Sequence, residues 1–459
     1  MKLTIHEVAK VIGAINDISQ YQDLELTGVK FDTRKIILGN IFVPLKGKRD
    51  GHDFIREAIK QGAIATLWAK NLEDAPYEIA VIQVTDPLAA MQQLASYYLQ
   101  KIQPEVIAIT GSNGKTTTKD MTYAILSKTY KTYKTQGNYN NEIGLPYTIL
   151  SMPDDTEKLV LEMGMDHPGD LHLLSTLTKP DIAVITLIGE SHLKTFKTRI
   201  NIAKGKFEII NGLKSNGTLI TPGNEPLLKP LIQKLPQKML TFGIDNTSDL
   251  RAKIISEEKT QTIFTLNFLE GKFTIPLSGS YNVKNALIAA FIGQQMKIAT
   301  KDICESLKKV KLTQNRTEWL KRDDGVEILS DIYNANPTAM KLVLKSFAQM
   351  PIPTTSRRIV ILGDMLNLGE NAKEFHKNLA FNLYPDTIHY LFLYGEEMSN
   401  LYQVIKIKYP KKTCFYYQKN DKVKLIKAVK AFIKPKDLVM LKASNEMGFK
   451  EIVDALLEY

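Results

Sequence analysis

The chain has 459 residues, enough for about three domains that each bury a core of their own. Hydrophobic residues make up 44% and charged residues 24%, which excludes a disordered, fibrous or small disulfide-stapled protein. Lys and Arg outnumber Asp and Glu by 60 to 49, a net charge of +11. The lysines are scattered, so a solvated surface explains this charge better than a nucleic-acid or membrane partner does.

Two cysteines, Cys304 and Cys414, lack the spacing of metal ligands, so we expect neither a disulfide framework nor a cysteine zinc site. Residues 1–7 break up the apolar core that a signal peptide needs. No stretch approaches the ~18 uncharged residues of a membrane span. We therefore expect a cytoplasmic protein.

The N-terminal part predicts a mixed α/β segment. Residues 4–12 have helical spacing, 40–45 and 78–84 have the pattern of strands, and 87–102 predict a helix with proline in its first turn. A domain boundary follows near Pro104.

Residues 106–110 form a short apolar, β-branched run of the kind found in buried parallel strands, followed at once by a glycine loop and a helical pattern. Further strands are predicted at 158–163, 181–188 and 217–221, with helices between them, which indicates a doubly wound sheet. After about Arg316 the alternation restarts, with a helix from Pro337 and strands at 326–331, 358–362, 389–394 and 437–441. We therefore expect an α/β fold with domains at 1–103, 104–316 and 317–459.

The strongest local motif is the run Gly111-Ser112-Asn113-Gly114-Lys115-Thr116-Thr117-Thr118 between the buried strand and a helix. Glycines let backbone N–H groups turn toward phosphate oxygens, and the helix N-terminus adds positive potential. Lys115 would reach the outer phosphates, and the Thr116 hydroxyl is placed for Mg²⁺. Ile109 stands where the full P-loop pattern has glycine, so this is a shortened variant. A purely structural glycine turn is the alternative.

Magnesium needs hard oxygen ligands near the carboxyl ends of the strands. Glu162 ends one predicted strand and His192 follows another, although a surface carboxylate and a structural histidine are the ordinary interpretations. Two asparagine-rich segments, 137–146 and 331–337, suit ligand amides and sugar hydroxyls, but turns and helix caps use asparagine for the same reasons. From spacing alone, Lys204 and Lys206 are solvated helix lysines.

The combination resembles the ATP-dependent Mur ligases of peptidoglycan synthesis. Residues 110–117 are similar to the nucleotide loop of that family, and Asp331-Ile332-Tyr333-Asn334-Ala335-Asn336-Pro337 is similar to the marker of members that add D-alanyl-D-alanine. Segments 31–34, 42–47 and 362–365 extend the similarity essentially end to end. The resemblance implies an N-terminal domain for the UDP end of the substrate, a central domain for ATP and a Rossmann-like C-terminal ligase domain.

The resemblance also implies roles for individual residues. Lys115 and Thr116 would serve ATP and its magnesium, with Glu162 and His192 at a magnesium position. Lys206 matches a lysine that is typically carbamylated in this family, with Lys204 as the alternative in register. Because carbon dioxide reacts only with a neutral amine, that lysine would need a lowered pKa.

The remaining implied contacts form two sets. Those to the nucleotide are Gly111, Ser112, Asn113, Gly114, Lys115, Thr116, Thr117, Asn282, Asn285, Arg316 and Asp331, the last through the ribose hydroxyls. Those to the UDP-muramoyl peptide are Asp32, Thr33, Arg34, Asn138 and Asn141. The chain departs from the family at Asn315, Ala339 and Asn445, where glycine, serine and arginine are usual. We therefore carry no anion-binding role to Asn445.

The implied reaction transfers the γ-phosphoryl group of ATP to UDP-N-acetylmuramoyl-tripeptide, and D-alanyl-D-alanine then attacks the acyl phosphate. We expect a monomer with hinges near Pro104 and Arg316 and with no nucleic-acid partner. One alternative is another amino-acid ligase, of the folylpolyglutamate type or elsewhere among the Mur ligases. The other is a P-loop binding or regulatory protein that uses ATP for conformational switching.

Overall fold

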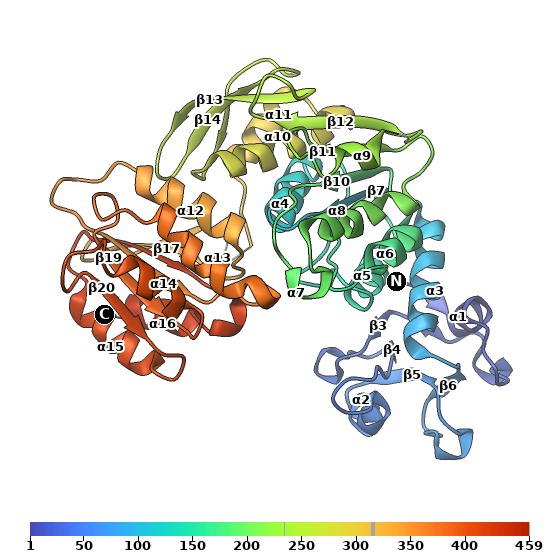
Figure 1. Cartoon of the computed structure of the whole chain (residues 1–459). Coiled ribbons are helices and arrows are strands. Elements are labelled where there is room, and N and C mark those ends of the chain that lie inside the picture. The colour runs from blue at the N-terminus through green and yellow to red at the C-terminus, as the bar shows by residue number, and fades with distance from the viewer. Residues whose placement is uncertain (234, 314–316, 459) are drawn as a thin grey trace.

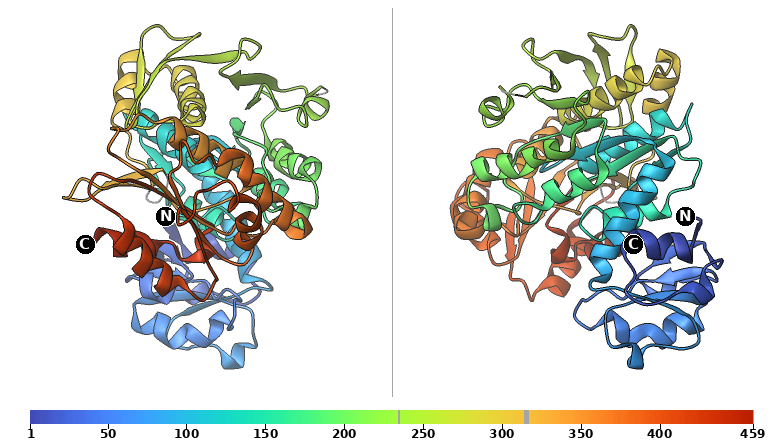
Figure 2. Two further views of the ribbon diagram at one scale, coloured as in Figure 1. Left: turned by 60° about the vertical axis from the view of Figure 1, so that its left-hand side comes forward. Right: turned by 90° about the vertical axis from the view of Figure 1, so that its right-hand side faces the viewer.

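A computed structural model describes residues 1–233, 235–313 and 317–458, and over these ranges the chain forms three α/β lobes (Figure 1). The middle lobe lies between the N-terminal and C-terminal lobes (Figures 1 and 2). This agrees with the α/β class expected from the sequence. We keep 1–103, 104–316 and 317–459 as the proposed domains. The second of these boundaries falls outside the described residues.

The N-terminal lobe has a small parallel sheet in the order β3-β4-β5-β6. The Thr4 side chain caps α1 by accepting from the Glu7 amide, and Asp86 caps α3 in the same way, with proline in its first turn. The elements are β1 (Leu3–Thr4), α1 (Ile5–Ile12), β2 (Glu25–Leu26), β3 (Gly28–Lys30), β4 (Asn40–Phe42), α2 (Ile55–Lys60), β5 (Ala63–Trp68), β6 (Ala80–Gln83) and α3 (Pro87–Ile102).

Helix α3 joins this lobe to the middle lobe, as Figure 2 shows. Its buried side chains, Met91, Leu94 and Tyr98 among them, belong to a hydrophobic core that extends from the first lobe into one face of the middle sheet. The two lobes therefore share buried apolar surface.

The middle lobe is built on a sheet in the order β15-β14-β13-β12-β11-β10-β7-β9-β8. Its strands are β7 (Glu105–Thr110), β8 (Thr132–Lys134), β9 (Lys158–Glu162), β10 (Ile182–Ile185), β11 (Thr218–Pro222), β12 (Lys238–Gly243), β13 (Leu250–Glu257), β14 (Thr262–Leu266) and β15 (Phe273–Ile275). Its helices are α4 (Lys115–Leu126), α5 (Gly144–Ser151), α6 (Asp170–Thr178), α7 (Leu193–Phe196), α8 (Arg199–Phe207), α9 (Lys229–Ile232), α10 (Ser280–Gln295) and α11 (Thr300–Lys308).

Strand β7 is apolar along its length because both of its faces are covered. Val106 and Ala108 pack into the core that α3, α5 and α6 share, whereas Ile107 and Ile109 pack into a second core with α4 and α10. This two-sided burial is what the doubly wound prediction requires.

The sheet extends further than the sequence analysis predicted. Strands β13, β14 and β15 pair antiparallel beyond the parallel part, and β12 joins them to it. In β13 the buried Leu250 and Ala252 alternate with the exposed Arg251 and Lys253. This is the pattern of a sheet that has one face exposed to solvent.

The C-terminal lobe has a sheet in the order β16-β17-β21-β18-β19-β20, parallel apart from the β16–β17 pair. The strands predicted in this region are all present with small shifts, whereas β16 and β20 were not predicted. The elements are β16 (Glu318–Lys321), β17 (Glu327–Asp331), α12 (Pro337–Gln349), β18 (Arg358–Gly363), α13 (Ala372–Asn378), β19 (Tyr390–Tyr394), α14 (Met398–Ile405), β20 (Cys414–Tyr417), α15 (Lys422–Phe432), β21 (Leu438–Lys442) and α16 (Lys450–Leu457). Among the described helices, none is both long and apolar enough to cross a membrane.

The packing of β9 predicts the effect of a core truncation. We expect Leu161→Ala, at a fully buried position, to lower the free energy of unfolding by about 2–5 kcal/mol because it leaves a cavity. Leu38→Ala, at a position 79% exposed, should change it by less than about 0.5 kcal/mol. Urea unfolding followed by circular dichroism measures both, and equal losses would contradict this packing.

Candidate active site

The glycine loop after β7 leaves no room for side chains at its two ends. Gly111 has φ +146°, and a Cβ there would collide with the Thr186 hydroxyl. Gly114 has φ +85°, and a Cβ there would lie 2.7 Å from Asn285 Oδ1. Thr186 fastens the loop by donating from Oγ1 to the Thr110 carbonyl at 3.1 Å. Both glycines are therefore required by backbone conformation and by close approach.

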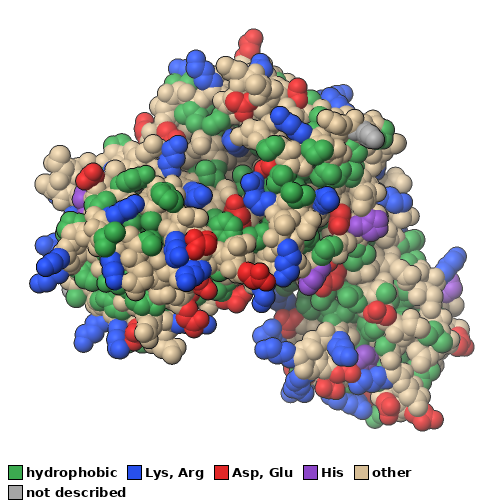
Figure 3. All heavy atoms as spheres, viewed as in Figure 1, with side chains coloured by type: hydrophobic (Ala, Val, Ile, Leu, Met, Phe, Trp, Pro, Cys, Tyr) green, Lys and Arg blue, Asp and Glu red, His purple; other side chains and the backbone are tan. Residues whose placement is uncertain are grey.

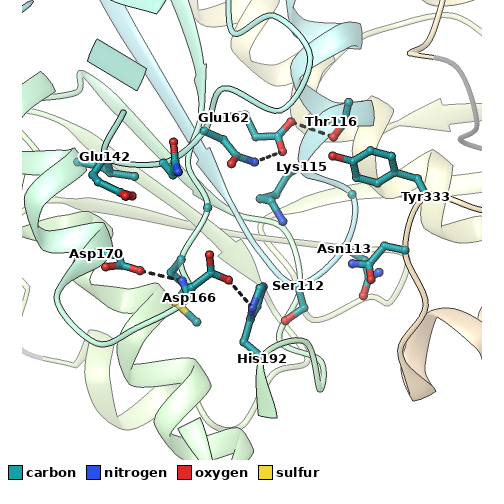
Figure 4. A pocket seen from close by; sticks show the side chains of 17 residues that line it. Ser112, Asn113, Lys115, Thr116, Glu142, Glu162, Asp166, Asp170, His192 and Tyr333 are labelled. Atoms are coloured by element: carbon teal, nitrogen blue, oxygen red, sulfur yellow. Dashed lines mark hydrogen bonds and ion pairs between the residues drawn. The ribbon is translucent and has the colours of Figure 1, made fainter. Parts of the chain in front are cut away.

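The sheet order β10-β7-β9 places the two predicted magnesium positions on either side of this loop. Glu162 at the end of β9 is only 3% exposed. Its Oε2 accepts from Thr116 Oγ1 at 2.8 Å, and its Oε1 accepts from Asn140 Nδ2 at 2.9 Å (Figure 4). The structure thus brings Thr116 and Glu162 together, and it adds Asn140, which the sequence analysis did not name.

His192 follows β10 and faces the loop that comes after β9. Its Nδ1 lies 2.9 Å from Asp166 Oδ1, and Figure 4 shows the two side chains pointing toward each other beside Lys115. The hydrogen bond from His192 holds the pKa of Asp166 below its usual value in spite of burial. Lys115 donates to the Gly111 carbonyl at 2.8 Å.

Lys206 on α8 is buried, with 2% of its surface exposed, whereas Lys204 is exposed. Burial, with a further effect of the Lys115 charge, lowers the pKa of Lys206 well below its usual value, and Asp166 opposes the shift. The Lys206 amine is therefore far easier to deprotonate than an ordinary lysine. This is the condition that the sequence analysis set for a carbamylated lysine.

Lys115, Thr116, Glu162, Asp166 and His192, but not Lys206, line a pocket that receives residues from the middle and C-terminal lobes. Acidic, amide and cationic side chains dominate it, so it suits a charged ligand with a metal ion better than an apolar one. Its lining comprises Ser112, Asn113, Gly114, Lys115, Thr116, Asn140, Asn141, Glu142, Glu162, Gly164, Met165, Asp166, Asp170, Leu174, His192, Tyr333 and Asn334.

A second pocket adjoins the first at Asn113, Gly114 and Asn334. One wall is apolar, from Leu342 and Val343 on α12, and the rest is mainly polar, which suits a flat base attached to a sugar. The predicted nucleotide contacts Thr117, Asn282, Asn285 and Asp331 all line it. Predicted Arg316 lies outside the described residues.

Asp331 is paired within this second pocket. Lys442 Nζ lies 2.5 Å from Asp331 Oδ2 and also donates to the Asn334 carbonyl at 2.9 Å. Lys442 is buried, so it neutralises a carboxylate that would otherwise oppose an anionic nucleotide.

Of the predicted UDP-peptide residues, Asn141 lines the first pocket, whereas Asp32, Thr33, Arg34 and Asn138 do not. Arg34 is paired with Asp32 at 2.8 Å and its side chain is 86% exposed, so it does not line that pocket. Their neighbours contact the asparagine-rich segment: Lys35 donates to the Tyr139 hydroxyl at 2.8 Å, and the Phe31 ring lies 6.3 Å from that of Tyr139.

Within the asparagine-rich segment the roles differ. Asn141 lines the first pocket, and its Oδ1 also accepts from the amide of Gly144, the first residue of α5, at 2.9 Å. The Asn138 carbonyl accepts from the Asn140 amide at 2.8 Å. Thr33 lies in the turn capped by Asp32. Asn141 therefore both stabilises the turn before α5 and forms part of the pocket lining.

The oxygen atoms that line the first pocket show whether it suits a magnesium ion. Thr116 and Glu162 supply hard oxygens next to the phosphate loop, and Mg²⁺ usually keeps several waters and takes only one or two carboxylates. Within the described ranges no cluster of three or more His, Cys, Asp or Glu could hold a metal by itself. The residues fit an ion that arrives with a nucleotide, not one held in an all-protein cage.

Comparison with known proteins agrees with this geometry. Residues 109–293 match the Mur ligase middle domain, and residues 315–445 match the Mur ligase glutamate ligase domain. The chain belongs to the Mur ligase family. Both matched parts contribute residues to the two pockets described above.

Relatives of this Mur ligase align along its whole length. It is 41% identical to UDP-N-acetylmuramoyl-tripeptide–D-alanyl-D-alanine ligase of Bacillus subtilis (strain 168), over 100% of this chain and 99% of that one. The Escherichia coli (strain K12) ligase of the same name is 30% identical over 98% of each chain.

Two solved structures are similar throughout. MurF from Acinetobacter baumannii matches with a TM-score of 0.89 and 26% identity, over 100% of this chain and 99% of that one. MurF ligase from Thermotoga maritima in complex with ADP matches with a TM-score of 0.80 and 27% identity, over 94% of this chain and 97% of that one.

The closeness of Asn285 to Gly114 predicts the effect of a single methyl group. Gly114→Ala should weaken ADP binding at least about tenfold, because Cβ would push the loop away from Asn285. Gly13→Ala places the same change at φ +66° in open space at the end of α1, and should leave ADP affinity unaltered. Isothermal titration calorimetry measures both. Wild-type affinity in a folded Gly114→Ala protein would contradict the role of this glycine.

Proposed function

We propose that this chain catalyses ATP-dependent amide formation between the terminal carboxylate of UDP-N-acetylmuramoyl-tripeptide and the amine of D-alanyl-D-alanine. One observation carries the proposal: the segment 331–337, which resembles the marker of D-alanyl-D-alanine addition, supplies Asp331, Tyr333 and Asn334 to the pockets around the phosphate loop. The full-length relatives of that name support the same conclusion.

Joining a carboxylate to an amine in water requires activation of the carboxylate. The γ-phosphoryl group of ATP passes to a carboxylate oxygen, giving an acyl phosphate and ADP. Two anions must meet, so the positive charge of Lys115 and the amides of the loop lower the barrier. Thr116, Glu162 and His192 would hold Mg²⁺, which supplies further charge neutralisation at the phosphates.

The amine of D-alanyl-D-alanine then attacks the acyl carbon, loses a proton, and the tetrahedral intermediate expels inorganic phosphate. The acyl phosphate must be kept from water until this attack. Contacts between lobes support such closure, since Asn336 of the C-terminal lobe donates to Asn113 Oδ1 of the phosphate loop at 2.9 Å. Hinges near Pro104 and Arg316 remain our prediction.

Charge around the site supports anionic substrates. Figure 3 shows a hollow between the N-terminal and C-terminal lobes, with Lys and Arg side chains gathered on the edge of the N-terminal lobe that faces it. The UDP diphosphate and the peptide carboxylates would be attracted to such an edge. We place the reaction in the cytoplasm, where ATP is available, and assign it to a monomer acting on small-molecule substrates.

We also propose that Lys206 is carbamylated. Its burial and lowered pKa favour the neutral amine that carbon dioxide needs, and the carbamate would put an anion able to support the metal close to Lys115 and Asp166.

The reaction is tested directly by mass spectrometry. Purified protein with UDP-N-acetylmuramoyl-tripeptide, D-alanyl-D-alanine, ATP and Mg²⁺ should give the pentapeptide. Lys115→Ala should lower kcat by about 10²–10³, because it removes a charge aimed at the transferred group. ATP hydrolysis that proceeds without the dipeptide and yields no amide would instead indicate a switching ATPase.

Carbamylation is tested by ¹³C NMR of protein incubated with ¹³C-bicarbonate. We expect a carbamate signal that is lost in Lys206→Arg and kept in Lys204→Arg. Because the protonated amine does not react, the signal should weaken as pH falls through the lowered pKa of Lys206 and return as pH rises. A signal that survives Lys206→Arg would overturn the assignment.

A further inference from the structure

The loop of residues 189–196 that carries His192 is held by the C-terminal lobe on both sides of the histidine. Before it, Glu190 accepts from the Thr338 amide at 3.1 Å and from the Thr338 hydroxyl at 2.8 Å. After it, the Lys194 amide donates to the Asn367 carbonyl at 3.0 Å. His192 is thus bracketed by contacts that exist only while the two lobes are together.

Ser191 adds a third contact from the same lobe. Asn336 Nδ2 donates to Ser191 Oγ at 2.9 Å, and the same amide nitrogen donates to Asn113 of the phosphate loop. On the other side, the Gly189 amide donates to Ser112 Oγ at 2.9 Å. The histidine loop, the phosphate loop and the start of α12 therefore form one connected unit.

His192 has a backbone conformation that needs outside support. Its φ is 64° and its ψ is 21°, the left-handed region that residues other than glycine rarely adopt. Such a residue keeps this conformation only where the surrounding structure imposes it. The contacts at positions 190, 191 and 194 are the surroundings that come from the other lobe.

The Glu190–Thr338 contact has favourable electrostatics. Helix α12 begins at Pro337, which has no N–H, so Thr338 offers the first free backbone donor of the helix. A carboxylate at a helix N-terminus is stabilised by the unpaired N–H groups there. Glu190 is largely buried at this position, which strengthens the interaction.

We propose that Glu190 and Thr338 are positioning residues: docking the N-terminus of α12 on Glu190 holds His192 in its left-handed conformation, facing Asp166 and the phosphate loop. The inference rests on the proposed function, in which His192 serves the magnesium position. It implies that lobe closure does more than exclude water, because it also completes the arrangement around the transferred phosphoryl group.

The same helix provides a matched control. Near the other end of α12, Ser346 Oγ donates to Glu257 Oε1 of the middle lobe at 3.4 Å, again a hydroxyl on a carboxylate between lobes. This contact lies far from the histidine loop in the chain and is not part of either pocket. Ser346→Ala therefore removes an interlobe contact without touching the loop of His192.

The experiment compares Thr338→Val, Thr338→Ser, Glu190→Gln and Ser346→Ala in the full chain. Thr338→Val should lower kcat about tenfold or more, the effect of losing a hydrogen bond to a charged group, with little change in KM for ATP. Thr338→Ser should restore kcat, Glu190→Gln should also lower it, and Ser346→Ala should leave it near wild type.

A second readout does not depend on turnover. In protein with ¹³C-labelled histidine, the ring signal of His192, assigned as the one lost in His192→Gln, should shift or broaden in Thr338→Val and stay in place in Ser346→Ala. An unchanged His192 signal and kcat in Thr338→Val, or equal effects of Thr338→Val and Ser346→Ala, would overturn the proposal. If the wild-type protein makes no pentapeptide, but Thr338→Val still shifts or broadens the His192 signal, then the proposed function alone is refuted.

Discussion

The close approach of other backbone and side-chain atoms to the phosphate loop is the constraint on which the rest of the site depends. Thr186 and Asn285 lie so near Gly111 and Gly114 that only glycine is accommodated, and this fixes where loop amides can face a nucleotide. Helix α4 starts at Lys115, directly after that turn, so its first N–H groups face the same place. The two pockets meet along this loop, at Asn113 and Gly114.

A buried set of charges holds α4 in place behind the loop. Lys119 lies 3.6 Å from Asp120 and 4.0 Å from Glu162, and Lys134 lies 2.7 Å from Asp120. Two cations thus face two carboxylates, and burial lowers the pKa of Lys119. Asp120 also accepts from the amide and hydroxyl of Thr313, at 2.9 and 2.8 Å. The helix that carries the phosphate loop therefore also anchors the segment that leads toward the C-terminal lobe.

Residue patterns in the sequence predicted those elements whose formation depends on neighbouring residues. The helix at 87–102, the strand before the glycine loop and the positions of Glu162 and His192 beside it follow from periodicity and strand order. The antiparallel hairpins β13–β15 were missed although β13 alternates buried and exposed residues. Burial of Lys206 but not Lys204, and the contacts of Asn140 and Glu190, depend on which helix face and which lobe lie opposite. Burial and contacts that depend on the tertiary structure cannot be inferred from the spacing of residues in the sequence.

In the proposed reaction, phosphoryl transfer from ATP to a peptide carboxylate precedes amide formation. The most direct measurement uses UDP-N-acetylmuramoyl-tripeptide whose terminal carboxylate carries ¹⁸O, with mass analysis of the inorganic phosphate released during synthesis. Transfer through an acyl phosphate predicts one ¹⁸O atom in each phosphate formed from fully labelled substrate. Phosphate free of ¹⁸O, released while the amide accumulates, would contradict the claim.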